Sequence, residues 1–117
     1  MSPAHNRSPA VGAVLAALDA GDSVDRTVLA TAVRALLAAL VERAPGRTVE
    51  VRIPPYGAIQ CGEGPRHTRG TPPNVVEMDP MTWISVATGR LGWTEAVSAG
   101  RIQVSGARSD ISPYLPL

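Results

Sequence analysis

The spacing of apolar residues changes several times along the chain. From residue 9 to residue 20 they recur every three or four positions, as on one face of a helix, and Gly21 then favours a helix end. A second helical pattern runs from about Arg26 to Arg43, where Pro45 and Gly46 stop it. Its apolar positions are Leu29, Val33, Leu36, Leu37, Leu40 and Val41. We therefore expect two helices in the first part of the chain.

The spacing then shortens to two residues. Between residues 47 and 53 apolar and polar side chains alternate, which is the pattern of a half-buried strand. One side would carry Val49, Val51 and Ile53, and the other Thr48, Glu50 and Arg52. Further strands are expected at residues 57–61, 74–78 and 101–105, the last with Ile102 and Val104 on one face.

Helix signals separate the last two of these strands. At Asp79-Pro80 a capping carboxylate precedes a proline suited to the first turn, so a helix should begin there and end near Gly89. Short helices are also expected over residues 93–99 and 107–114. This order predicts an α+β fold, in which a small, mostly antiparallel sheet of about four to five strands packs against helices.

Composition narrows the class of protein. The 117 residues suit one domain, which we expect at residues 9–117 after a flexible tail at residues 1–8. A formal net charge of +1 gives no basic excess for nucleic acid or membrane surfaces. All basic side chains are Arg, so Schiff-base catalysis by lysine is excluded. One cysteine, no signal pattern and no long apolar run predict a cytoplasmic protein without stable membrane insertion.

Residues 66–69, Arg66-His67-Thr68-Arg69, form the densest cationic cluster. Two guanidiniums, a hydroxyl and nearby glycines could hold a phosphate or carboxylate. The alternative is a structural loop whose arginines pair with neighbouring carboxylates. His67 lacks a recognisable nucleophile or orienting carboxylate, so catalysis is the weakest interpretation. Neither a metal site nor a cofactor is expected, and Cys61 reads as a small buried apolar residue rather than a reactive thiol.

A family resemblance is carried by two segments, DPMTWISVATGRLGWTEAVSAGRIQVSG at residues 79–106 and GPRHTRGTPPNVVE at residues 64–77. The first resembles the C-terminal half of the sterol carrier protein type-two fold. From about Ala10, the chain resembles the small bacterial sterol carrier orthologues of actinobacteria, and the exclusive use of Arg fits a GC-rich genome. The resemblance implies a sheet and helices around an apolar ligand, because relatives bind sterols, fatty acids or acyl-coenzyme A, or serve as accessory domains.

These observations favour a non-catalytic protein that binds an apolar or acyl-type ligand in an aliphatic cleft. The candidate lining residues are Val33, Leu36, Leu37, Leu40, Trp83, Ile102 and Leu115. Each is equally suited to a closed core, and a filled core would favour the alternative of a protein-interaction or accessory domain. The proline-interrupted residues 111–117 are a candidate movable cover. The sequence leaves open whether the chain forms a homo-oligomer.

Overall fold

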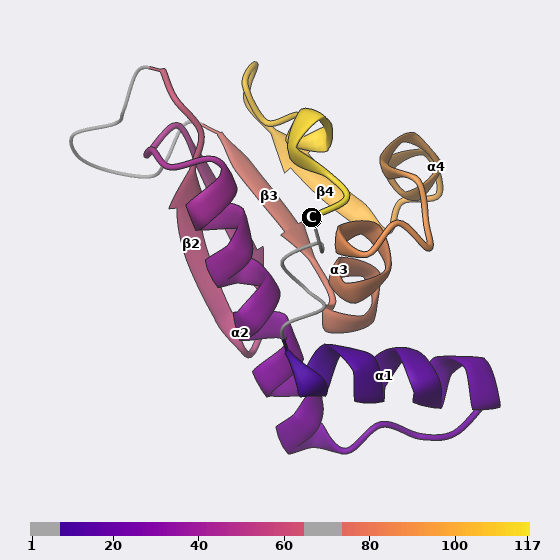
Figure 1. The fold of residues 1–117 in the computed structure, drawn as a ribbon. Coiled ribbons are helices and arrows are strands. Elements are labelled where there is room, and N and C mark those ends of the chain that lie inside the picture. Colours follow the sequence, from indigo (N-terminus) through magenta and orange to yellow (C-terminus); the bar gives the residue numbers. More distant parts are fainter. Residues whose placement is uncertain (1–7, 65–73) are drawn as a thin grey trace.

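The computed structural model describes residues 8–64 and 74–117 of the chain. In these residues the chain forms helices and a four-stranded sheet (Figure 1). The elements are α1 (Pro9–Ala20), α2 (Arg26–Arg43), β1 (Val49–Ile53), β2 (Gly57–Cys61), β3 (Val75–Met78), α3 (Pro80–Ala87), α4 (Trp93–Ser98), β4 (Ile102–Ser105) and the 3₁₀ helix η2 (Ser112–Tyr114). No helix among these residues has the length and apolarity to cross a membrane. The expected α+β class is confirmed.

The sheet is mixed, with the strand order β2-β1-β3-β4. The outer pairs, β1 with β2 and β3 with β4, are antiparallel, whereas the central pair β1 and β3 is parallel. Parallel neighbours need a connection that returns the chain to the starting end of the sheet, and here β2 makes that return. As a result, the start of β1, the end of β2 and the start of β3 lie at one end of the sheet.

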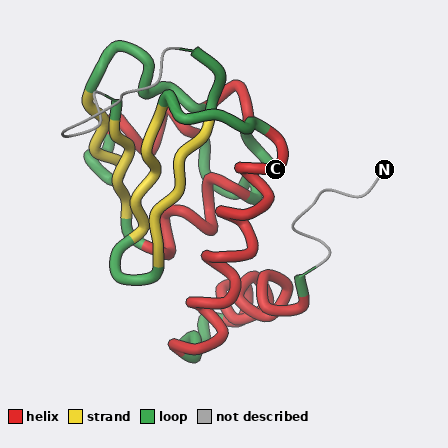
Figure 2. The backbone as a smooth tube through the Cα atoms, turned by 90° about the vertical axis from the view of Figure 1, so that its left-hand side faces the viewer, coloured by secondary structure: helices red, strands yellow, loops and turns green. Residues whose placement is uncertain are grey.

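The two faces of the sheet differ in polarity, and the helices gather on one side of it (Figure 2). Val49, Val51 and Ile53 of β1 are buried on the covered face, as the alternation predicts. On the other face, Glu50 Oε1 accepts a hydrogen bond from Arg52 Nε at 3.0 Å. This hydrogen bond and the charge of Glu50 raise the pKa of Arg52, and the charge of Glu77 adds to the effect. The sheet therefore has one apolar face and one polar face.

Capping side chains set the helix starts. Asp25 accepts a hydrogen bond from the Val28 N–H at 3.1 Å at the start of α2. Asp79 accepts from the N–H groups of Met81 and Thr82 at 3.1 and 3.2 Å, and also from the Thr82 hydroxyl. Pro80 occupies the first turn of α3, where its missing N–H costs nothing. The helix start expected at Asp79-Pro80 is confirmed.

Helix α1 lies across the N-terminal end of α2, at the edge of the molecule (Figure 1). Val11 and Val14 are its buried side chains. Asp19 Oδ1 forms an ion pair with Arg90 Nη2 at 2.8 Å, which joins α1 to the turn between α3 and α4. Gly21 ends the helix with a φ of 71°, a left-handed conformation that glycine adopts readily.

Three expectations need correction. The helix expected over residues 107–114 is reduced to the 3₁₀ turn η2, because Pro113 interrupts the hydrogen-bond pattern of a longer helix. Val104 shares the covered face with Ile102 but is 42% exposed, since β4 is an edge strand. Thr48 was expected beside Glu50 on the polar face, yet it is only 4% exposed. It precedes β1, so the alternation of the strand does not govern it.

Candidate functional site

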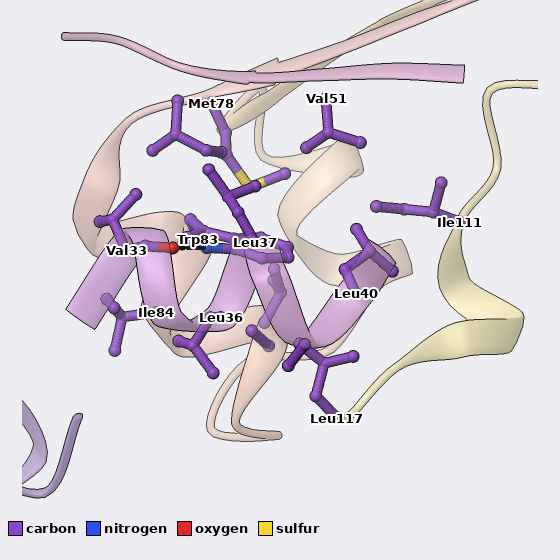
Figure 3. Close-up of a cluster of buried hydrophobic side chains, with 14 of the residues drawn as sticks. Val33, Leu36, Leu37, Leu40, Val51, Met78, Trp83, Ile84, Ile111 and Leu117 are labelled. Atoms are coloured by element: carbon purple, nitrogen blue, oxygen red, sulfur yellow. Dashed lines mark hydrogen bonds between the residues drawn. The ribbon is translucent and has the colours of Figure 1, made fainter. Parts of the chain in front are cut away.

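The candidate apolar lining residues lie together in the core. Val33, Leu36, Leu37 and Leu40 of α2 are buried, and each is at most 2% exposed. Trp83 of α3 is fully buried, and its indole Nε1 donates a hydrogen bond to the Val33 carbonyl at 3.2 Å (Figure 3). Ile102 is 3% exposed, and Leu115 packs against the cluster while partly buried. These side chains belong to, or pack against, one apolar core cluster.

The C-terminal segment, defined here as residues 106–117, covers part of that cluster. It inserts Ile111 and Leu117 into the core, where they are 0% and 5% exposed and approach Leu40 of α2 (Figure 3). The Leu117 N–H donates a hydrogen bond to the Ala87 carbonyl at 2.9 Å, so the end of the chain is held against the end of α3. Pro113 and Pro116 stay exposed between the anchors. The segment is thus attached through two buried side chains.

A small hollow, here called the polar pocket, opens at the end of the sheet where β1 begins and β2 ends. Its volume is about 250 Å³. It is lined by Thr48, Val49, Gly62, Glu63, Ala107, Arg108, Asp110 and Tyr114. The lining therefore comes from three separate stretches of the chain: the start of β1, the turn after β2, and the C-terminal segment.

Thr48 lines the polar pocket, and the Asn74 side chain connects Thr48 to Arg108. The Asn74 side chain is 6% exposed; its Nδ2 donates to the Thr48 carbonyl at 3.0 Å, and its Oδ1 accepts from the Arg108 N–H at 2.9 Å. One amide thereby joins β1, β3 and the C-terminal segment. The Thr48 hydroxyl is different. Among the described residues it is the buried side-chain polar atom that has no hydrogen-bond partner.

Two glycines leave room beside these groups. A Cβ at Gly64 would lie 3.0 Å from Thr48 Oγ1 and 3.1 Å from Arg108 Nη1, so the hydroxyl and the guanidinium flank this residue. A Cβ at Gly62 would lie 3.5 Å from the Tyr114 hydroxyl. Both glycines have a positive φ, 87° at Gly62 and 138° at Gly64, which residues with side chains rarely adopt. The turn thus brings bare backbone close to three hydrogen-bonding side chains.

Two carboxylates complete the lining. Asp110 Oδ1 accepts a hydrogen bond from the Ser112 N–H at 2.9 Å, which fixes it at the start of η2. Glu63 is exposed. In the described part of the chain the ion pairs are Arg52–Glu50 and Arg90–Asp19, so neither carboxylate neutralises Arg108. The arrangement can bind a polar group and offers no nucleophile with an adjacent base.

Cys61 ends β2 on the covered face and is fully buried. Desolvation raises the pKa of its thiol from 9.0 to about 11. A thiol of this kind is a poor nucleophile at neutral pH, since the thiolate is the reactive form. The burial expected for Cys61 is confirmed.

The cationic residues Arg66, His67, Thr68 and Arg69 lie outside the described residues, so the anion-binding loop stays a prediction. Within residues 8–64 and 74–117, no group of His, Cys, Asp or Glu side chains could hold a metal ion. Sequence reasoning missed the polar pocket, because Thr48, Asn74 and Arg108 are far apart along the chain. The Gly62-Glu63-Gly64 turn was the one local signal, and it indicated close backbone approach without naming the partners.

Comparison with known proteins adds the family. No curated protein matches the chain recognisably. The family model described as bacterial SCP ortholog matches residues 25–117, which include every element except α1. This range holds α2, the whole sheet, the polar pocket and the C-terminal segment. The chain therefore belongs to the bacterial SCP orthologs, a bacterial family of the sterol carrier proteins.

Proposed function

We propose that the chain is a cytoplasmic, non-catalytic protein that binds an apolar or acyl-type ligand between α2, the sheet and the C-terminal segment. The observation that carries the proposal is the seating of Ile111 and Leu117. These two aliphatic side chains occupy the core from a segment otherwise marked by exposed prolines, on a surface formed by the candidate lining residues. An alkyl chain would take the place of the two side chains when the segment moves.

The free energies of burial favour ligands with long alkyl chains over ligands with short ones. Withdrawing two buried aliphatic side chains costs about 3–6 kcal/mol, at about 1.5–3 kcal/mol each. A dodecyl chain gains about 9 kcal/mol at about 0.8 kcal/mol per buried methylene, whereas a butyl chain gains about 2 kcal/mol. Association costs reduce both values. Dodecanol is therefore expected to bind much more tightly than butanol.

The test is organic extraction of the purified protein followed by mass spectrometry, with dodecanol titration of the delipidated chain. We expect a co-purified acyl lipid. Leu117→Ala should tighten dodecanol binding by about tenfold, because it removes burial that competes with the ligand. Val11→Ala, a matched truncation of a buried side chain in α1, should lower stability and leave the affinity unchanged. Equal affinities in wild type and Leu117→Ala would contradict a cover at this position. Deletion of residues 113–117 should speed ligand release if the deleted chain still folds.

A second candidate function, a protein-interaction or accessory domain, is favoured by the tight burial of the lining residues. Six of the seven candidates are at most 3% exposed, and they line neither the polar pocket nor a second hollow formed by Glu50, Ala58, Ile59 and Gln60. A lipid-free extract together with no dodecanol binding would support this candidate over carriage.

A further inference from the structure

The Thr48 hydroxyl is buried without a hydrogen-bond partner, at a residue that is 4% exposed and lines the polar pocket. Leaving such a group unmatched costs about 1–3 kcal/mol, so buried hydroxyls are nearly always paired. Thr82, which is fully buried, follows that rule, because its hydroxyl donates to Asp79. Thr48 therefore marks a place where a partner from outside the chain would be stabilised.

Arg108 supplies the charge beside that hydroxyl. Its Nη1 and Thr48 Oγ1 flank Gly64, at 3.1 and 3.0 Å from the position a Cβ would take. The backbone of Arg108 is held by Asn74 at 2.9 Å, and no ion pair engages its guanidinium within the described residues. A guanidinium and a hydroxyl side by side are suited to the oxygens of an anionic group.

The volume of the polar pocket and the charges around it limit the kind of anion that can bind there. A volume of about 250 Å³ corresponds to roughly eight water molecules at about 30 Å³ each, too small for a whole lipid. Glu63 and Asp110 also line the polar pocket and would repel a doubly charged group more than a singly charged one. These limits favour a carboxylate over a phosphate dianion.

We propose that the polar pocket binds the carboxylate of a ligand, with Arg108 and Thr48 donating hydrogen bonds to its oxygens and the Tyr114 hydroxyl lying beside them. The carboxylate belongs either to a small free acid or to the end of a fatty acid. Val49 lines the pocket and also belongs to the apolar core, so the two regions are neighbours. The carboxylate site does not depend on the proposed function.

The experiment is a titration with butyrate, dodecanoate and dodecanol, followed through the amide NMR signals of Gly62 and Gly64. Arg108→Gln should weaken carboxylate binding at least about tenfold, the loss expected for a charge-assisted hydrogen bond. Glu63→Gln should tighten it about two- to threefold by removing repulsion at the pocket. Arg101→Gln, which removes an exposed arginine at the opposite end of β4, should change nothing.

The outcomes separate the two proposals. If Arg108→Gln weakens the binding of both butyrate and dodecanoate, the site binds carboxylates in general. If the variant weakens the binding of dodecanoate alone, the site binds a fatty acid. No carboxylate binding, equal effects of Arg108→Gln and Arg101→Gln, or weaker binding in Glu63→Gln would each overturn the carboxylate site. Dodecanol has no carboxylate, so its affinity should be the same in wild type and Arg108→Gln and tests only the binding of an apolar ligand. Either proposal can therefore fail while the other stands.

Discussion

The covered face of the sheet and the polar pocket at its end differ in how completely their groups are matched. On the covered face, apolar side chains pack together, and the indole N–H of Trp83 donates a hydrogen bond to the Val33 carbonyl. In the polar pocket, Thr48 Oγ1 has no partner and Arg108 has no ion pair within the described residues. The contrast teaches that contacts within the chain satisfy the first region, whereas the second keeps hydrogen-bonding groups that no described residue satisfies.

The largest expected effect tests the matched region. Trp83→Ala should lower the free energy of unfolding by about 3–5 kcal/mol, because it empties a fully buried site and removes a hydrogen bond. Urea denaturation measures the change. Trp83→Phe keeps most of the packing and should cost clearly less. Near-equal stability of Trp83→Ala and wild type would mean that the core is not closed around this ring.

The pH dependence of stability tests the burial of Cys61 in the same region. Burial raises the pKa of its thiol from 9.0 to about 11, so the folded chain holds the proton more tightly than the unfolded chain does. The resulting stability is complete below about pH 8.5 and is lost as pH rises toward 11, by at most about 3 kcal/mol. Urea denaturation across this range should show the fall in wild type, and Cys61→Ala should lack that part of it. Identical pH profiles would contradict a buried thiol.

The smallest expected effect compares two buried threonines. Thr82→Val should destabilise the chain by about 1 kcal/mol, since it removes the hydroxyl paired with Asp79. Thr48→Val removes a hydroxyl with no partner and should leave stability unchanged or raise it by about 1 kcal/mol. Thermal denaturation without ligand measures both. A loss for Thr48→Val as large as that for Thr82→Val would show that the Thr48 hydroxyl is already satisfied.

Much of the fold follows from local signals. Asp79 caps the helix that its position predicts, and Gly21 ends α1 in the left-handed conformation. These features depend on neighbouring residues, so the sequence displays them directly. The parallel pairing of β1 with β3 has no such signal, because it depends on where β2 returns the chain.

The candidate sites were harder to predict from the sequence than the fold was. Apolar spacing placed Val33 and Leu40 on the buried face of α2, but it could not tell a core from a ligand cleft. The polar pocket depends on contacts between distant segments, such as the Asn74 amide that joins Thr48 to Arg108. Neither the burial of Thr48 nor the proximity of Arg108 to Gly64 produces a repeating pattern in the amino-acid sequence.

The Asn74 amide has a mechanical consequence. It ties the backbone of Arg108 to the body of the protein, whereas the chain beyond Arg108 is anchored by Ile111 and by Leu117. If Ile111 and Leu117 leave the core, the segment beyond Arg108 can rotate while the Arg108 N–H stays bound to Asn74. Under the two proposals above, the carboxylate of a long-chain acid would bind before its alkyl chain enters the core.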